Sequence, residues 1–244
     1  MNLYVSSGGY NLFWQLGILK RLRDNHNFWN QVNNIYAISS GAVATIYLYT
    51  IPEPEDNNCM STSFCQWWES FNRRSDAKSM RYIYKSGYKF IETWPKTIDE
   101  TEVLRDYENK NFFYGISHWN KYYMPFDFKW HKVNMNSFQD RTRKAMLSGY
   151  APYFIAKPEL VWMKRGIDGV FAYKHQRDFP RTDGNETVQV TANGLPEVRD
   201  NRLNITQRRE DIIQLWHKLT SLRVRQMYNS GRKDADEFLS ANGF

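Results

Sequence analysis

Ser39 stands in the sequence context that best fits a nucleophile. It follows the apolar run Ile35–Ile38 and precedes Ser40-Gly41-Ala42, an order that predicts a strand, a sharp turn and a helix. A serine on such a turn presents its hydroxyl at the carboxyl end of a sheet, where it can attack a carbonyl carbon. Gly41 is the small residue that a tight turn needs, and the first N–H groups of the next helix favour negative charge. Taken alone, this pattern is more often an ordinary helix cap.

A second candidate group is the loop Ser6-Ser7-Gly8-Gly9, directly after the apolar run Leu3–Val5. Consecutive glycines allow backbone N–H groups to approach a ligand closely. The N–H groups of Gly8 and Gly9 could hold the oxyanion of a tetrahedral intermediate. The simpler alternative is an ordinary turn. A nucleotide phosphate loop is disfavoured, because neither G-x-G-x-x-G nor G-x-x-x-x-G-K-[ST] occurs.

The third candidate is Asp168, within Ile167-Asp168-Gly169-Val170. A carboxylate that lies beside a serine can accept the hydroxyl proton directly, without a histidine. The alternative is again local, since Asp-Gly is a common turn sequence. None of the three segments defines a function by itself, but together they fit acyl transfer.

The elements that must position these residues follow from the spacing of apolar side chains. Within the first fifty residues, strands are expected over 3–5 and 35–38, and helices over 12–23 and 42–49. The polar composition of the segment 24–34 predicts a linker. This order of strand, helix, strand and helix predicts a parallel sheet with crossover helices, and therefore an α/β fold.

The later part of the chain predicts a mixture of elements. Residues 62–110 look mostly helical. Further strands are expected over Phe112–Trp119, Phe126–Val133, Leu160–Met163 and Val188–Thr191. The first two of these would pair as a hairpin. Helices are expected from Ser137 to Leu147 and from near Asn204, where Gln207 completes a pattern resembling a capping box. Apolar residues spaced three or four apart predict that the last helix packs on the sheet.

Length and composition fit one domain spanning residues 1–244. The formal net charge of +7 and the 16% of aromatic residues suit an acidic partner, either nucleic acid or an anionic membrane surface. The sequence has no run of about 18 apolar residues and no signal-peptide pattern. We therefore expect an intracellular protein, cytoplasmic or peripherally attached to a membrane. Cys59 and Cys65 are expected to be reduced thiols.

Four segments resemble, in the family's order, the motifs of the patatin-like phospholipases. These segments are Leu3–Leu22, Ala37–Ala42, Ala145–Phe154 and Ile167–Val170. The first matches the spacing of a glycine-rich block through Gly8, Gly9 and Gly17. The second resembles the G-x-S-x-G-A elbow, the third an A-S-x-A-x-P-x-x-F segment with one residue of slack, and the fourth the D-G-[GA] motif. Each motif is short, but their joint occurrence in order is specific.

The resemblance implies a three-layer α/β/α sandwich with a mostly parallel central sheet. It also implies a lipid acyl hydrolase of the phospholipase A or lipase type. Ser39 would attack the acyl carbonyl with Asp168 as its base, forming an acyl-enzyme, while Gly8 and Gly9 hold the oxyanion. Patatin-like enzymes need no metal, cofactor or histidine for this reaction. The histidines of the chain lie in no catalytic motif; they are His26, His118, His131, His175 and His217.

Some positions match the family pattern and others depart from it. Gly41 and Gly169 stand where the family has residues that support the elbow and the aspartate. Leu12 and Ala37 replace glycines, and Val170 replaces glycine or alanine. Such changes would narrow the oxyanion loop or displace the aspartate. The main alternative is therefore a catalytically inactive lipid- or protein-binding module on the same fold.

The expected substrate is a phospholipid or another acyl lipid, reached by peripheral contact with an anionic membrane surface. A basic patch within Arg73–Lys85 and the Trp and Tyr residues of the 62–130 region motivate this expectation. Nucleic acid is not expected, because the sequence has no zinc-finger spacing, RNP-like segment or long basic run. A conventional Ser–His–Asp esterase is disfavoured, since Ser39 comes too early in the chain and His217 lies on a predicted helix.

Overall fold

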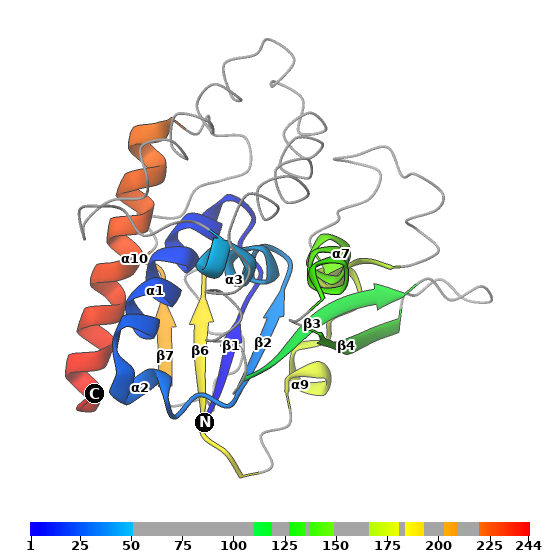
Figure 1. The fold of residues 1–244 in the computed structure, drawn as a ribbon, viewed down its shortest axis with the longest axis horizontal. Helices are drawn as coiled ribbons and strands as arrows, with labels where there is room; N and C mark the ends of the chain where they lie inside the picture. Colours follow the sequence, from blue (N-terminus) through cyan, green and yellow to red (C-terminus); the bar gives the residue numbers. More distant parts are fainter. Residues whose placement is uncertain are drawn as a thin grey trace.

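A mixed sheet flanked by helices forms the described part of the chain, which we analysed as a computed structural model. The structure describes residues 1–50, 110–118, 127–134, 137–148, 166–180, 184–192, 203–208 and 220–244. The strands are β1 (Asn2–Val5), β2 (Asn34–Ile38), β3 (Asn111–His118), β4 (Asp127–Val133), β5 (Ile167–Asp168), β6 (Thr187–Thr191) and β7 (Leu203–Thr206). The α-helices are α1 (Leu12–Asp24), α2 (His26–Trp29), α3 (Ser40–Thr50), α7 (Phe138–Ser148), α9 (His175–Asp178) and α10 (Ser221–Asn242), and the 3-10 helices are η1 (Gly9–Asn11) and η4 (Gly169–Phe171). Figure 1 shows their arrangement.

The seven described strands form one sheet in the order β4-β3-β2-β1-β6-β7, with β5 paired to β3. The central strand β1 pairs in parallel with β2 and with β6. The pairs β2–β3 and β6–β7 are also parallel, whereas β3 runs antiparallel to both β4 and β5. The sheet is therefore mostly parallel, and its carboxyl ends gather at the upper edge in Figure 1.

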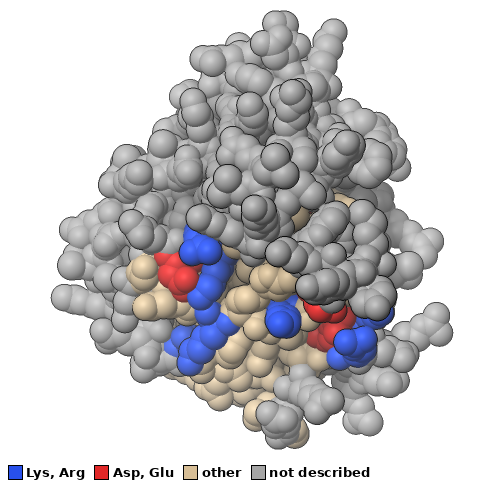
Figure 2. Space-filling view, turned by 90° about the vertical axis from the view of Figure 1, so that its right-hand side faces the viewer, with Lys and Arg blue, Asp and Glu red and all other residues tan. Residues whose placement is uncertain are grey.

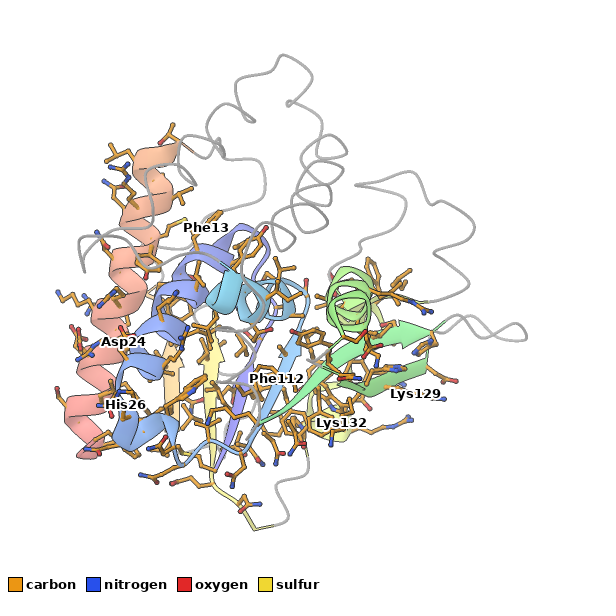
Figure 3. All side chains as sticks on the ribbon, in the orientation of Figure 1. Phe13, Asp24, His26, Phe112, Lys129 and Lys132 are labelled. Atoms are coloured by element: carbon orange, nitrogen blue, oxygen red, sulfur yellow. The ribbon has the colours of Figure 1, made fainter. Side chains whose placement is uncertain are left out.

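One face of the sheet is covered by α1, α3, α7 and α10. Alternate strand residues point to this face and join the main core with the helices, among them Leu3, Val5, Ile35 and Ala37. Figure 3 shows Phe13 near the upper end of α1, with Asp24 and His26 at the opposite end. The helix therefore runs back from the carboxyl edge of the sheet to its lower edge, as a crossover connection must.

The opposite face is packed with aromatic rings. Tyr4 of β1 lies 5.1 Å from Phe179 and 6.3 Å from Tyr173, measured between ring centroids. Trp130 of β4 lies 5.2 Å from the ring of Tyr36 and donates its indole N–H to the carbonyl of Asp178, at the end of α9. The sheet thus has helices on both faces. The predicted α/β sandwich with a mostly parallel central sheet is confirmed.

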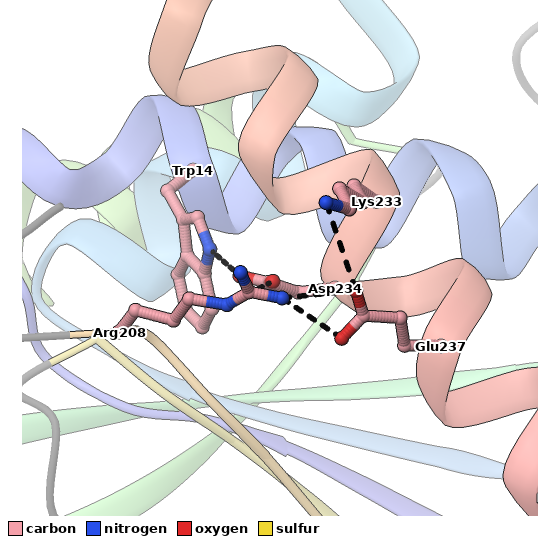
Figure 4. Close-up of polar contacts among 5 residues, drawn as sticks. All are labelled: Trp14, Arg208, Lys233, Asp234 and Glu237. Carbon is pink, nitrogen blue, oxygen red and sulfur yellow. Dashed lines mark hydrogen bonds and ion pairs between the residues drawn. The ribbon is translucent and has the colours of Figure 1, made fainter.

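The α10 helix packs closely against α1. A Cβ atom on Gly17 would overlap the carbonyl of Tyr228, and one on Gly231 would overlap the carbonyl of Trp14. The two helix backbones are therefore in direct contact at these glycines. Figure 4 shows a polar cluster beside this contact, in which the Trp14 indole donates to Asp234 at 2.7 Å.

Most elements of the first fifty residues match the predicted ones, although the predicted linker contains the short helix α2. The hairpin of β3 and β4, the helix after Ser137 and the strand at Thr187–Thr191 also match. The predicted helix start near Asn204 is wrong, because Leu203–Thr206 forms β7 and pairs with β6. The described C-terminal helix begins at Ser221, where Thr220 caps it. It packs mainly on α1 and also contacts β7 of the sheet.

Several predictions fall outside the described residues. They concern the helices expected within 62–110, the basic patch at Arg73–Lys85, the cysteines Cys59 and Cys65, and the strand at Leu160–Met163. Among the described helices, none combines the length and the apolar composition needed to cross a membrane.

Candidate active site

Ser39 occupies the sharp turn between β2 and α3. Its φ is 56°, and it is the one non-glycine residue with positive φ in the part of the chain that the structure describes. A non-glycine residue in this region stores about 1–3 kcal/mol of backbone strain, which the surrounding fold must offset. A Cβ on Gly41 would lie 2.5 Å from the Val5 carbonyl oxygen, so the residue two positions after Ser39 has no room for a side chain.

The backbone of this turn is anchored by Ser148, the last residue of α7. The Ser39 N–H donates to Ser148 Oγ at 3.1 Å, and Ser148 Oγ donates to the carbonyl of Gly115 in β3 at 2.7 Å. Ser148 is fully buried. It thus ties the elbow to both α7 and β3. Ser148 lies within the segment Ala145–Phe154 that resembles a family motif, but no role was predicted for it, because nothing local shows that α7 ends beside Ser39.

Asp168 lies beside Ser39 because β2 and β5 pair with consecutive parts of the same edge of β3. Along one edge, β3 pairs with β2 as far as Ile38↔Gly115, and then with β5 at Ile116↔Asp168. A strand has two hydrogen-bonding edges, and β4 occupies the other one. β5 therefore continues where β2 ends, which places Asp168 next to the residue that follows Ile38.

The carboxylate of Asp168 accepts hydrogen bonds on both oxygens. Ser39 Oγ donates to Oδ2 at 2.6 Å, and the Val170 N–H donates to Oδ1 at 3.0 Å. Asp168 is only 5% exposed. Burial raises its pKa to about 6, although the two hydrogen bonds favour the charged form and oppose this shift. The result is a carboxylate with the basicity of a histidine side chain, in direct contact with a serine hydroxyl.

The residues after Asp168 pack closely against β3 and are hydrogen-bonded to it. A Cβ on Gly169 would lie 2.5 Å from the carbonyl oxygen of Gly115. Ser117 Oγ donates to the Gly169 carbonyl at 3.0 Å and accepts from the Ala172 N–H at 3.1 Å. Glycine at 169 thus allows the close approach that the Asp168 position requires. Ser117 is a second buried serine to which sequence analysis gave no role.

The glycine loop lies between β1 and α1, beside the elbow. Gly9 has a φ of 55°, a conformation that favours glycine. Gly8 has an ordinary φ, but a Cβ there would lie 2.6 Å from Ala192 Cβ and 3.3 Å from Ser40 Oγ. The two glycines are therefore needed for different reasons. The position of Ser40 also shows that the loop touches the residue after Ser39.

The peptide between Gly8 and Gly9 has a fixed orientation. The Gly8 carbonyl accepts from both the N–H and the side-chain amide of Asn11, at 3.0 and 2.9 Å. In a trans peptide the C=O and the next N–H point in opposite directions, so the Gly9 N–H points away from Asn11. Within the described residues, neither glycine N–H donates to another residue.

Two of the described histidines form a pair of their own. The Nε2 atoms of His118 and His131 are 2.6 Å apart. Partial burial is the main cause that lowers both pKa values, that of His131 to about 4. The Ser39 hydroxyl donates to a carboxylate and not to either imidazole. Within the described residues, no group of three or more His, Cys, Asp or Glu side chains could hold a metal ion.

Comparison with known proteins finds similarity among solved structures. No family model matches the sequence, and no curated protein matches it. Two solved structures of the effector protein ExoU are similar to this chain. One is the heterodimeric ExoU–SpcU complex from the type III secretion system of Pseudomonas aeruginosa, with a TM-score of 0.46, 11% identity, and coverage of 99% of this chain and 51% of that chain. The other, of the type III effector ExoU, has a TM-score of 0.44, 13% identity, and coverage of 98% and 52%. The chain thus spans about half the length of the ExoU chains it matches.

Proposed function

We propose that the chain is a lipid acyl hydrolase in which Ser39 and Asp168 form a catalytic dyad. The observation that carries this proposal is the 2.6 Å hydrogen bond from Ser39 Oγ to Asp168 Oδ2, made from a serine on a strained turn. The resemblance of the surrounding motifs to patatin-like phospholipases supplies the reaction class. Hydrogen-bonded contact between nucleophile and base is the geometry that a general-base mechanism requires.

The reaction proceeds in two halves. Asp168 takes the proton of Ser39 Oγ as this oxygen attacks the acyl carbonyl, and the N–H groups of Gly8 and Gly9 hold the oxyanion. The intermediate collapses to an acyl-enzyme, and protonated Asp168 gives its proton to the leaving alcohol oxygen. In the second half, Asp168 takes a proton from a water molecule that attacks the acyl-enzyme. That proton passes to Ser39 Oγ as the fatty acid leaves, which restores the starting state.

The surface next to Asp168 suits an acyl lipid. Val170 is 46% and Phe171 45% exposed, and they are two of the three large hydrophobic side chains that are exposed in the described part of the chain. They immediately follow Asp168-Gly169, and the Val170 N–H is bonded to the Asp168 carboxylate. An acyl chain whose carbonyl lies at Ser39 would have this apolar pair within reach. Val170, one of the departures from the family pattern, thus enlarges the apolar surface.

The alternative of an inactive lipid- or protein-binding module rests on the replaced glycines. Ala37 is fully buried in β2, and its Cα pairs with Val5 and Tyr114. Leu12 begins α1. The hydrogen bond between Ser39 and Asp168 is present despite both residues, which favours the active enzyme over the inactive module.

Labelling by a fluorophosphonate probe tests the proposal. The probe should label the wild-type protein and release its leaving group, while Ser39→Ala should not react. Hydrolysis of a p-nitrophenyl acyl ester should follow the same pattern. Labelling that survives in Ser39→Ala would contradict the proposed nucleophile. A folded wild-type protein that neither reacts nor hydrolyses the ester would favour the inactive module.

A further inference from the structure

The side chain of Gln15 connects the glycine loop to the elbow. Gln15 lies on α1 and is fully buried. Its Nε2 donates to the Ser6 carbonyl at 2.6 Å, and its Oε1 accepts from Ser40 Oγ at 2.9 Å. Ser6 begins the loop that carries Gly8 and Gly9, and Ser40 is the residue directly after Ser39. One amide therefore spans the two segments between which the acyl carbonyl would lie.

The direction of these hydrogen bonds is fixed by chemistry. A backbone carbonyl can only accept, so the NH₂ group of Gln15 must face Ser6. The amide oxygen then faces Ser40, and the Ser40 hydroxyl must donate to it. Any side chain that replaces Gln15 must offer a donor on one side and an acceptor on the other. A carboxylate cannot do this, because it only accepts.

The loop is held from its other side as well. Ser6 Oγ accepts from the Ala192 N–H at 3.2 Å, next to β6. The Asn11 side chain, which holds the Gly8 carbonyl, accepts from Gln207 Nε2 at 3.1 Å. Ala192 follows β6 and Gln207 follows β7, so these contacts fix the loop to the sheet, whereas Gln15 and Ser40 link it to the elbow. This link therefore sets where the loop N–H groups lie relative to Ser39.

We propose that Gln15 and Ser40 are positioning residues, which hold the oxyanion N–H groups of the glycine loop in register with Ser39. Neither residue touches the acyl group, and both act through the backbone segments that they join. The inference rests on the proposed function of Ser39. Its consequence is specific to the transition state, because the loop donors bind an oxygen that becomes fully charged only there.

Kinetics should separate positioning from simple structural support. Gln15→Leu removes both hydrogen bonds, and Ser40→Ala removes only the second. We expect the acylation rate constant to fall by about a hundredfold in Gln15→Leu, comparable with loss of an oxyanion donor, and by less in Ser40→Ala. KM for a soluble ester should change little in either. Ser40→Ala keeps the test valid if Gln15→Leu does not fold. Wild-type acylation rates in folded Ser40→Ala and Gln15→Leu would overturn the proposal, and so would equal increases in KM with kcat unchanged.

The variant Gln15→Glu allows a measurement, the pH dependence of the rate, that a purely structural role of Gln15 would not change. Protonated glutamic acid can donate to Ser6 and accept from Ser40, but glutamate repels the Ser6 carbonyl. Burial raises the pKa of such a carboxyl. The ratio of the variant rate to the wild-type rate should therefore fall as the pH rises, and the titration of Asp168 cancels in this ratio. The matched control is Gln31→Glu, because Gln31 is exposed and also donates to a backbone carbonyl, that of Asn27; its ratio should stay constant.

The possible outcomes distinguish this inference from the function on which it rests. If the wild type reacts and Ser39→Ala does not, but the Gln15→Glu ratio is independent of pH, the positioning role fails and the dyad stands. If Ser39→Ala reacts like the wild type, the proposed function fails and the inference fails with it. A ratio that falls with pH in Gln15→Glu and stays constant in Gln31→Glu supports both.

Discussion

Asp168 must be charged to act as a base, yet it is buried. Removal from water raises its pKa, while the hydrogen bonds from Ser39 and Val170 lower it, and burial has the larger effect. A base with a pKa near 6 is still charged at pH 7 to 8, and it accepts a proton more readily than an ordinary carboxylate does. In the proposed dyad, the burial of Asp168 would explain how Ser39 can be activated without a histidine.

The proposed dyad predicts non-additive losses of activity. Asp168→Asn keeps the size of the side chain but removes the base, so its rate should fall nearly as far as that of Ser39→Ala. The double variant should be no worse than either single one, because residues that act as a unit lose their contribution together. Ester hydrolysis by the three variants checks this. Rate losses that multiply in the double variant would show that the two residues act independently.

The pKa of Asp168 predicts the pH dependence of acylation. Only the deprotonated carboxylate can take the Ser39 proton, so the rate should rise with pH, reach half its maximum near pH 6 and then level off. Measurement of fluorophosphonate labelling from pH 4 to 9 checks this, with circular dichroism as a control for folding. A midpoint near the ordinary aspartate pKa of 3.8 would show that burial does not raise the pKa of Asp168, and a rate that does not change with pH would show that Asp168 is not the base.

The same shift predicts a cost in stability. The pKa of Asp168 is higher in the folded state than its ordinary value of 3.8, so folding becomes less favourable as the pH rises from about 4 to about 6. The loss amounts to about 3 kcal/mol above this window. Asp168→Asn lacks the charge and should melt at a higher temperature than the wild type at pH 8, with a smaller difference at pH 4. A constant difference across this range would contradict the linkage.

At the scale of elements, the sequence predicts those parts that depend on local patterns. The helix at Leu12–Asp24 and the strands on either side of it have clear apolar spacing and glycine-rich ends. β7 was mistaken for a helix start because Asn204 and Gln207 have the spacing of a capping box. Pairing with β6 decides its structure instead, and a short local motif carries no information about that partner.

The candidate site also contains some residues that the sequence predicts and others that it does not. Ser39 and Asp168 could be proposed from the sequence because each lies in a short motif of its own. Ser148 could not, since its bond to the Ser39 N–H joins segments that only the sheet brings together. Gln15 did carry a signal: it shares a helix face with Leu19 and Leu22, so it is a polar residue on an apolar stripe. Such a residue needs buried partners, but the sequence does not show which ones.

The contact between α1 and α10 predicts that Gly231→Ala is destabilising. The new methyl group would overlap the Trp14 carbonyl, which forces the helices apart beside the bond from Trp14 to Asp234. Overpacking of this kind costs about 1–3 kcal/mol, more than alanine contributes in helix propensity. The melting temperature should therefore fall. Ser240→Ala, on the exposed side of the same helix, is the control and should leave it unchanged or slightly higher.

At the scale of the whole molecule, the net charge of +7 remains the main argument for an anionic surface as partner. On the face shown in Figure 2, the described Lys and Arg side chains lie in separate groups, and acidic side chains adjoin some of them. Among the described ion pairs, Lys144 pairs with Asp140 at 2.7 Å. The described residues therefore present mixed charge on this face. The apolar pair Val170 and Phe171 is the most direct candidate for contact with lipid.

A further prediction concerns how the proposed enzyme would reach a lipid in a bilayer. Phe171→Asp places a charge on the exposed apolar pair beside Asp168, so hydrolysis of phospholipid in vesicles should fall at least tenfold, while a soluble short-chain ester is cleaved at nearly the wild-type rate. Leu222→Asp is the matched control, because Leu222 is more exposed, at 65%, but lies on α10; it should leave both rates unchanged. Equal losses on both substrates in Phe171→Asp would show that Phe171 supports the site itself.

The net charge makes a separate prediction about membrane binding. Binding to phosphatidylserine-rich vesicles should exceed binding to neutral ones and weaken with salt, since each Lys or Arg near the surface contributes about 1 kcal/mol and salt screens this attraction. Equal binding to both kinds of vesicle would leave the charge without a role at the membrane.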